Sequence, residues 1–159
     1  MSCYINDKTG AMRITVYGEP FAQERPRFSV FGGHVHAYDP KKSKDYKNTI
    51  CAETVQLMYM AKQKGYTLPL DCPLQFALYI YRSIPKSFSK AKQRAAREHR
   101  LYPSTKPDTD NYIKVVLDGM GFQKSKILFT DDSRIVSIRA VKLYDDQPRI
   151  EAWLKPVEQ

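Results

Sequence analysis

Cysteine is scarce in this chain of 159 residues, and its three cysteines stand far apart. Cys3, Cys51 and Cys72 form none of the closely spaced pairs that structural zinc sites use, and an odd number does not suit a disulfide framework. A chain of this length buries enough surface to fold around one hydrophobic core without covalent support. The sequence therefore predicts a single domain over residues 1–159.

Long apolar runs are also missing. The best candidate, residues 76–81, is far shorter than the roughly 20 residues that a transmembrane helix needs. The first residues, Met-Ser-Cys-Tyr-Ile-Asn-Asp, lack the apolar centre of a signal peptide. We therefore expect a protein without a membrane partner, in a reducing intracellular compartment.

Acidic residues are few. The chain has 17 Asp and Glu against 26 Lys and Arg, which gives a formal net charge of +9. An excess of this size on one domain indicates a polyanionic partner, most simply nucleic acid. An acidic membrane surface is the alternative, but the chain offers no basic helix with a leucine or aromatic face to insert.

One stretch places two carboxylates, an amide and a lysine within seven residues at the start of a predicted helix. Residues 107–114 read Pro-Asp-Thr-Asp-Asn-Tyr-Ile-Lys, and Asp108 takes the position of an N-cap. The helix follows from apolar residues at helical spacing: Ile113, Val116, Leu117 and Met120. Asp110, Lys114 and Asp118 form a row at i, i+4 spacing away from that stripe.

A second acidic pair, Asp131 and Asp132, follows this helix after a loop. Clustered carboxylates supply the oxygen ligands that Mg²⁺ and Mn²⁺ prefer, and a helix N-terminus attracts phosphate. Alternatively, Asp108 only caps the helix and Asp110 only pairs with Lys114. The second acidic pair and the basic remainder of the chain favour the metal site.

The two acidic motifs together resemble the signature of the RusA family of Holliday-junction resolvases. That signature has Asp-x-Asp-Asn-x-x-Lys on a helix, an Asp one turn later, and an Asp-Asp element leading into a strand. The resemblance is strong over residues 106–144 and looser in the N-terminal part. It implies a homodimeric, metal-dependent endodeoxyribonuclease that resolves branched DNA in recombination and repair, in the cytoplasm of a bacterium or a phage-infected cell.

The resemblance also implies roles for individual residues. Asp108, Asp110 and Asp132 would be catalytic ligands of Mg²⁺ or Mn²⁺, with Asp131 in place of Asp132 if the register slips by one. Lys114 would stabilise transition-state charge or orient the water, and no organic cofactor is expected. Two alternatives stay open: a non-catalytic basic DNA-binding module, and a different metal-dependent nuclease.

Three segments are candidate DNA contacts. Residues 27–38 are predicted to form a hairpin across Gly32 and Gly33, with Phe31 opposite His34. One of its faces carries rings and a cation, and this face is either a DNA platform or a solvated surface. A helix capped by Asp39 is predicted to run to about Lys64, with lysines in its first two turns that face either an anion or solvent.

The third segment is an insert over residues 82–106, which holds eight basic residues and one acidic residue. Its middle is helical by propensity, with an apolar face of only Phe88, Ala91 and Ala95. We expect the insert to be mobile in the free protein and to clamp DNA. The DNA-binding residues predicted over the three segments are Arg25, Arg27, Lys41, Lys42, Lys90, Arg94, Arg97 and Lys106.

Further strands are predicted over residues 12–17, 74–81, 133–144 and 149–154, the second of them buried on both faces. With the helices between them, this order predicts an α+β fold: one mixed sheet covered by helices on one face.

Overall fold

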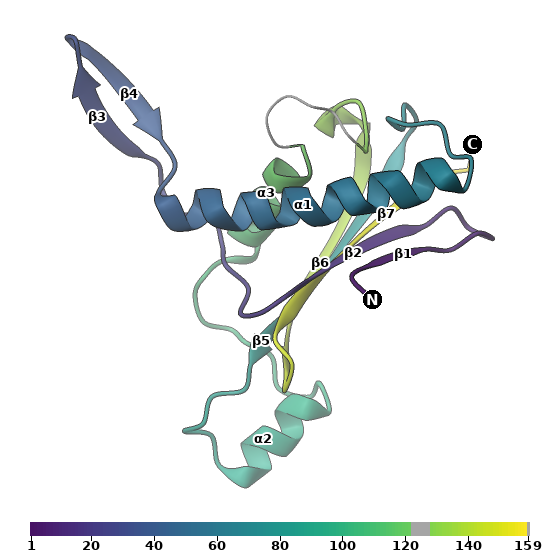
Figure 1. The fold of residues 1–159 in the computed structure, drawn as a ribbon. Helices are drawn as coiled ribbons and strands as arrows, with labels where there is room; N and C mark the ends of the chain where they lie inside the picture. The colour runs from purple at the N-terminus through teal and green to yellow at the C-terminus, as the bar shows by residue number, and fades with distance from the viewer. Residues whose placement is uncertain (122–127, 159) are drawn as a thin grey trace.

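The structure is a computed structural model that describes residues 1–121 and 128–158. Its centre is a five-stranded mixed sheet in the order β1-β2-β7-β5-β6 (Figure 1). All neighbouring strands are antiparallel except β5 and β6, which run parallel and are joined by a crossover that contains α2 and α3. The predicted α+β class is confirmed. The strands of the sheet are β1 Cys3–Ile5, β2 Met12–Tyr17, β5 Leu74–Ser83, β6 Ile135–Asp145 and β7 Arg149–Pro156.

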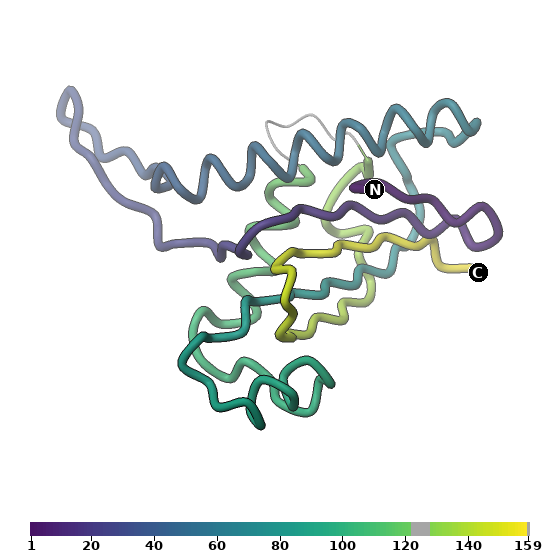
Figure 2. Tube along the Cα trace, turned by 60° about the horizontal axis from the view of Figure 1, so that its bottom comes forward, coloured from purple at the N-terminus to yellow at the C-terminus, as the bar shows by residue number. Residues whose placement is uncertain are grey.

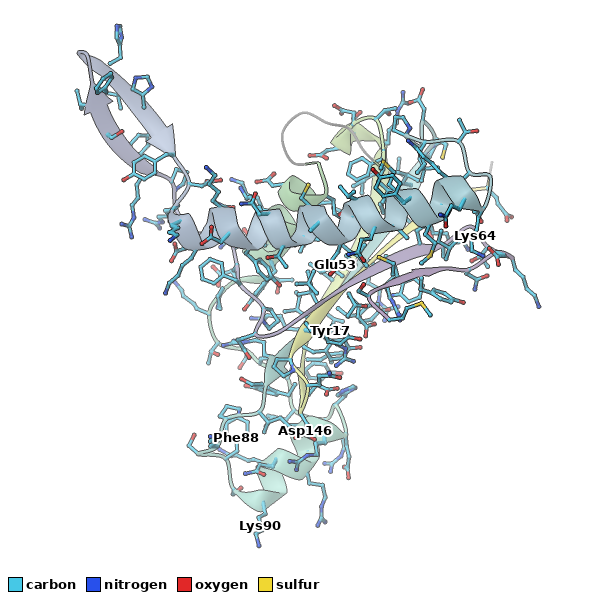
Figure 3. The ribbon with its side chains drawn as sticks, in the orientation of Figure 1. Tyr17, Glu53, Lys64, Phe88, Lys90 and Asp146 are labelled. Carbon is cyan, nitrogen blue, oxygen red and sulfur yellow. The ribbon has the colours of Figure 1, made fainter. Side chains whose placement is uncertain are left out.

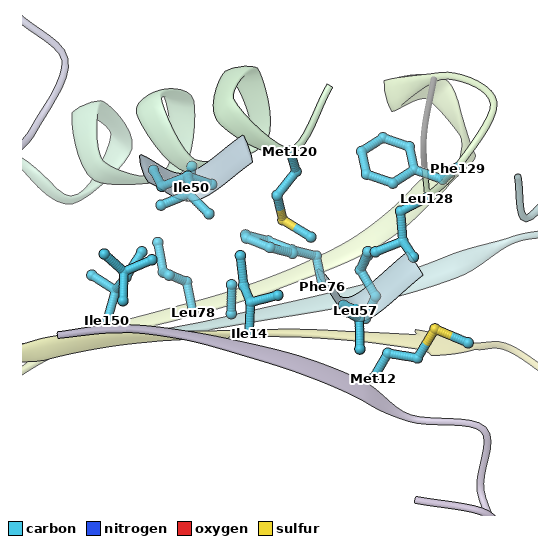
Figure 4. Packing of buried hydrophobic residues seen from close by; sticks show 14 of the residues in the cluster. Met12, Ile14, Ile50, Leu57, Phe76, Leu78, Met120, Leu128, Phe129 and Ile150 are labelled. Atoms are coloured by element: carbon cyan, nitrogen blue, oxygen red, sulfur yellow. The ribbon is translucent and has the colours of Figure 1, made fainter. Parts of the chain in front are cut away.

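Two helices cover one face of the sheet, as the sequence predicts. Helix α1 (Lys41–Gln63) and helix α3 (Thr109–Met120) lie across this face, and the core fills the space between them and the strands (Figures 2 and 4). The two helices meet closely at Gly119, where an added Cβ atom would lie 2.8 Å from Ile50. None of the described helices is long and apolar enough to cross a bilayer.

The opposite face of the sheet is open. Strand β5 was predicted to be buried on both faces, but only Leu74, Phe76, Leu78 and Ile80 are fully buried. On the other face Gln75 is exposed, Ala77, Tyr79 and Tyr81 are half-buried, and all four line a shallow hollow of about 460 Å³. The prediction failed because none of the described elements forms a second layer over this face.

Both helices differ in detail from the sequence prediction. Asp39 is not the N-cap of α1: Pro40 occupies that position, and no side chain caps the helix. The buried stripe of α3 is rotated, so that Tyr112, Val115 and Val116 are fully buried while Ile113 and Leu117 are only partly buried. The predicted end of α1 before Gly65, which has φ +86°, is confirmed.

The predicted hairpin is present, with the predicted register, but it stands apart from the core. Strands β3 (Arg27–Phe31) and β4 (His34–Tyr38) pair only with each other, with Phe31 opposite His34. Every residue of both strands is exposed. This β3–β4 ribbon projects from the N-terminal end of α1 (Figure 1).

The insert contains helix α2 (Lys90–Arg97), capped by the Ser89 hydroxyl. It follows β5 at the same end of the sheet at which β2 leads into the ribbon, because Tyr17 and Tyr81 both pair with Arg149 (Figures 1, 2 and 3). The apolar face of the insert agrees with the prediction at Phe88 and Ala95, which are partly buried, but Ala91 is exposed and Ala96 is fully buried in its place. Phe88 lies edge-on against Tyr144 of β6, with ring centroids 5.6 Å apart. The insert is therefore anchored to the sheet, and its mobility stays a prediction.

The sequence also predicts a loop over residues 121–128, with Ile127, Leu128 and Phe129 as its apolar anchor. Residues 122–127, including Ile127, lie outside the described residues. The other two anchors, Leu128 and Phe129, are buried as predicted. Phe129 also forms an isolated parallel bridge with Leu70.

Candidate active site

Two cations on the sheet fix the chain just before α3. Lys142 of β6 donates from Nζ to the carbonyl oxygens of Thr105 at 2.9 Å and Pro107 at 3.1 Å. Arg82 at the end of β5 donates to the carbonyl oxygen of Lys106 at 3.2 Å. Three consecutive carbonyl oxygens are thereby held by the two parallel strands. The sheet therefore fixes the position of the backbone that leads into Asp108.

Asp108 and Asp110 are both exposed at the start of α3. Asp108 occupies the N-cap position, but its side chain makes no capping hydrogen bond. Within residues 1–121 and 128–158, no ion pair joins Asp110 to Lys114, which is also exposed. The alternative that Asp108 only caps the helix and Asp110 only pairs with Lys114 therefore lacks both of the contacts that it predicts.

A buried lysine on α1 links α3 to the end of the ribbon. The side chain of Lys47 is 7% exposed and donates to Asp39 at 2.8 Å and to Asp118 at 3.0 Å. Burial alone would lower the pKa of Lys47, but the hydrogen bonds to the two carboxylates raise it. The hydrogen bond from Lys47 likewise lowers the pKa of Asp39, which also accepts from Gln23 Nε2 at 3.1 Å.

The sequence left open whether the lysines in the first two turns of α1, Lys47 among them, face an anion or solvent. The anion that Lys47 faces is supplied by the protein itself, so this lysine is not part of a DNA-binding surface. The sequence held a signal for its burial, since Lys47 lies at helical spacing with Ile50 and Thr54 on the buried stripe. Its partners could not be predicted, because Asp118 is 71 residues away in the chain.

The second acidic pair lies near the other end of α3. Asp131 accepts a hydrogen bond from the Ser133 amide at 2.9 Å and so caps a short 3₁₀ helix, Asp132–Arg134. Burial raises the pKa of Asp132, and the nearby carboxylates of Asp118 and Asp131 raise it further. Asp132 is thus electrostatically coupled to Asp118, which lies about 12 Å along the helix axis from Asp110.

The predicted metal ligands therefore divide into two places, Asp108 with Asp110 at the start of α3 and Asp132 with Asp131 near its end. No three acidic, His or Cys side chains of the described residues lie close enough together to hold one ion. The donors are nevertheless all carboxylate oxygens, as hard cations require. The raised pKa of Asp132 also reflects negative charge that a cation would neutralise.

The predicted DNA-binding residues are exposed and form two groups. Arg25, Arg27, Lys41 and Lys42 surround the base of the ribbon, where Arg27, Lys41 and Lys42 help line a hollow of about 370 Å³. Lys90, Arg94 and Arg97 belong to α2 of the insert, which lies apart from the ribbon (Figure 1), and Lys106 closes the insert two residues before Asp108. Arg97 is already bound to Asp146 at 2.8 Å.

Comparison with known proteins agrees with this arrangement. The uncharacterized protein YqaN of Bacillus subtilis (strain 168) is 36% identical over 148 residues, which are 92% of this chain and 96% of that protein. The family described as Endodeoxyribonuclease RusA matches residues 17–155, from the end of β2 to β7. This range includes the ribbon, α3 and both acidic motifs. The chain therefore belongs to the RusA family of endodeoxyribonucleases.

Proposed function

We propose that this protein is a divalent-metal-dependent endonuclease that resolves Holliday junctions or other branched DNA by phosphodiester hydrolysis, in recombination and repair. The observation that carries the proposal is the pair Asp108 and Asp110, two exposed carboxylates in neither a cap nor an ion pair, on a RusA-family chain of net charge +9. Asp110 still interacts favourably with the dipole of α3 from its first turn, but neither carboxylate makes the cap or the ion pair that the structural alternative predicts.

Asp108 and Asp110, together with Asp132 or Asp131, would hold Mg²⁺ or Mn²⁺. The ion, when bound, supplies a Lewis acid that stabilises charge on the phosphate oxygens and lowers the pKa of water. Because Asp132 lies beside Asp118 in the structure, a three-carboxylate set requires the segment that contains Asp132 to approach the start of α3.

Lys114 offers a free ammonium one turn beyond Asp110. Its exposed position allows it to contact a phosphate oxygen or to orient a water, and its charge contributes to the lowered pKa of Asp39. Asn111 lies between the two and is partly buried. We assign to Lys114 the role of stabilising negative charge in the transition state. The basic groups of the ribbon and the insert would bind the DNA backbone.

The proposed enzyme acts as a homodimer on four-way DNA, in the cytoplasm of a bacterium or phage-infected cell. Two strands of opposite arms must be cut symmetrically, and a two-fold dimer presents two equivalent sets of carboxylates.

The test is to incubate the purified protein with end-labelled four-way junction, linear duplex and double-stranded RNA, with and without Mg²⁺. Symmetrical cuts in the junction alone, only with the metal, support the proposal. Binding without cutting would indicate a non-catalytic module, and equal attack on linear or RNA substrates would indicate a different nuclease.

The control variant is Asp110→Asn. It should lose cleavage because a ligand oxygen is replaced by an amide, and it should keep or tighten junction binding because one carboxylate no longer repels the phosphates. A cleavage rate near that of the wild type would overturn the role of Asp110.

A further inference from the structure

The β3–β4 ribbon pairs with no other strand of residues 1–121 and 128–158. Its large apolar side chains are mostly in solvent, with Phe28 70%, Val30 72%, Phe31 82% and Val35 68% exposed. An isolated two-stranded hairpin is at best marginally stable in water, and clustered exposed apolar side chains indicate a binding surface. The ribbon is therefore built to meet a partner.

The register gives the ribbon two different faces. Phe31 and His34 are paired at the tip, Ser29 and His36 in the middle, and Arg27 and Tyr38 at the base, all on one face. We call this the ring face. Phe28, Val30, Val35 and Ala37 lie on the opposite face, and residues 27–38 contain no acidic side chain.

Both ends of the ribbon are tied to α3, the helix that begins with Asp108. Before the ribbon, the backbone N–H of Gln23 donates to the carbonyl oxygen of Asn111 at 3.0 Å. After the ribbon, Asp39 is joined through buried Lys47 to Asp118. The two segments that flank the ribbon are thus attached to the helix that carries Asp110, so the base of the ribbon lies next to the candidate catalytic carboxylates in the fold.

The base of the ribbon is positively charged. Arg25, Arg27, Lys41 and Lys42 are exposed there against one exposed carboxylate, Glu24, and the first turn of α1 contains no acidic residue. Asp39, the nearest carboxylate after the ribbon, is already neutralised by Lys47. These cations match a phosphate backbone. Two ribbons packed against each other would bring two such groups of like charge together, which opposes a second copy as the occupant.

We propose that the ribbon is the element that recognises the branch point of DNA. Its basal cations bind the phosphate backbone, and Phe31 at the tip stacks on bases that the branch point leaves without a stacking neighbour. In a continuous duplex every base is already stacked, so the tip gains nothing there. This inference rests on the proposed function, and it assigns the selectivity for branched DNA to a residue outside the acidic motifs.

Removing the ring should affect branched DNA selectively. Alanine substitution of a base-stacking aromatic weakens binding roughly 5- to 150-fold, so Phe31→Ala should lower junction affinity about tenfold or more. Its affinity for linear duplex should be unchanged, and Phe31→Trp should retain the preference for the junction. Because Phe31 is 82% exposed, these variants should fold like the wild type.

Two matched controls are available on the same chain. Phe28→Ala removes an equally exposed ring from the opposite face of the ribbon, and Tyr59→Ala removes a 61% exposed ring from the far half of α1. Both should leave the ratio of junction to duplex affinity within about twofold of the wild type, since neither ring lies on the ring face of the tip.

A fluorescent base reports the contact directly. With 2-aminopurine placed at the branch point, wild type and Phe31→Trp should change its fluorescence on binding, and Phe31→Ala should not. With 2-aminopurine in the middle of an arm, none of the three should do so.

The outcomes separate the two proposals. If the wild-type protein neither prefers nor cuts junctions, the proposed function is wrong, and so is the role of the ribbon. A wild type that resolves junctions, with Phe31→Ala retaining both the preference and the fluorescence change, overturns only the role of Phe31. A variant that alters the sedimentation of the free protein but not the fluorescence would assign the ribbon to contacts between copies, which also overturns this inference.

Discussion

At the residue scale, Lys47 determines how three separate parts of the chain meet. Its ammonium lies between Asp39, which follows the ribbon, and Asp118, on the helix that carries the candidate catalytic residues. Lys47 itself is buried, while each carboxylate is about a third exposed. Solvent therefore weakens the bridge, but breaking it would leave a buried charge short of partners.

The Asp39 carboxylate should make folding stability depend on pH. Its pKa is lowered in the folded protein from 3.8, chiefly by the hydrogen bond from Lys47. A lowered folded-state pKa contributes stability above the unfolded-state value, and this contribution is lost as the pH falls through the folded-state value. The difference in Tm between wild type and Asp39→Asn should thus be largest near pH 7 and shrink below about pH 4.

Thermal unfolding of both proteins from pH 7 to pH 3 measures this effect. Asp7→Asn is a suitable control, because Asp7 pairs with Lys64 on the surface and such pairs contribute little. A Tm difference for Asp39→Asn that stays constant down to pH 3 would mean that the bridge is not responsible.

Replacement of Lys114 by Ala should reduce turnover far more than junction binding. An ammonium that acts on the transition state contributes to kcat and only weakly to substrate affinity. Single-turnover cleavage rates and junction Kd values, measured on the same preparation, separate the two quantities. Equal losses in both would make Lys114 a phosphate contact, and no loss in either would leave it without a role.

Only part of this residue-level chemistry is accessible from sequence. The position of Asp108 at the helix start follows from local spacing, and the structure confirms it. The sequence does not reveal that the Asp108 carboxylate makes no capping hydrogen bond. The backbone just before Asp108 is held by Lys142, which lies on a strand distant in sequence. The coupling of Asp132 to Asp118 is equally non-local.

At the element scale, the sequence predicts those strands and turns whose signals lie in neighbouring residues. The alternation in Met12–Tyr17 defines β2, and the Gly32-Gly33 turn, with φ of +58° and +79°, defines the ribbon and its register. Strand β1 escaped prediction because three residues carry too little periodicity. The burial of β5 on only one face was predicted wrongly, because its nearly continuous apolar residues do not tell whether a second layer covers them.

The insert should bind DNA through the exposed side of α2. Lys90 and Arg94 are exposed one turn apart, whereas Arg97 holds the helix to Asp146 and contributes only if that ion pair opens. Lys90→Ala combined with Arg94→Ala should remove two phosphate contacts. The log–log salt dependence of junction binding would then flatten by about 2 units.

Lys8→Ala combined with Lys62→Ala removes the same charge from exposed sites outside the ribbon and the insert, and it should leave the salt slope unchanged. Melting temperatures of both double variants should stay close to wild type, because exposed charges contribute little to stability. An unchanged slope in the α2 variant would assign DNA binding to the cations at the base of the ribbon.

At the scale of the whole molecule, α3 lies between two basic regions. The ribbon with its basal cations and the insert extend in different directions from the same end of the sheet, and the start of α3 follows directly from the insert (Figures 1 and 2). DNA that contacts both regions must pass the exposed carboxylates of Asp108 and Asp110. A negative patch between two positive ones repels the backbone locally, so bound DNA is held in place by its flanks.

The last prediction concerns the number of chains. One chain carries one Asp-x-Asp motif, and resolution of a four-way junction needs two cuts in two strands related by a two-fold axis. We therefore expect a dimer in sedimentation at micromolar concentration. A heterodimer of wild type and Asp110→Asn, prepared by co-expression with two different tags, should nick one strand and leave the junction unresolved. If the heterodimer cuts both strands at the wild-type rate, or if a strict monomer resolves the junction, one set of carboxylates serves both cuts and the two-fold argument is wrong.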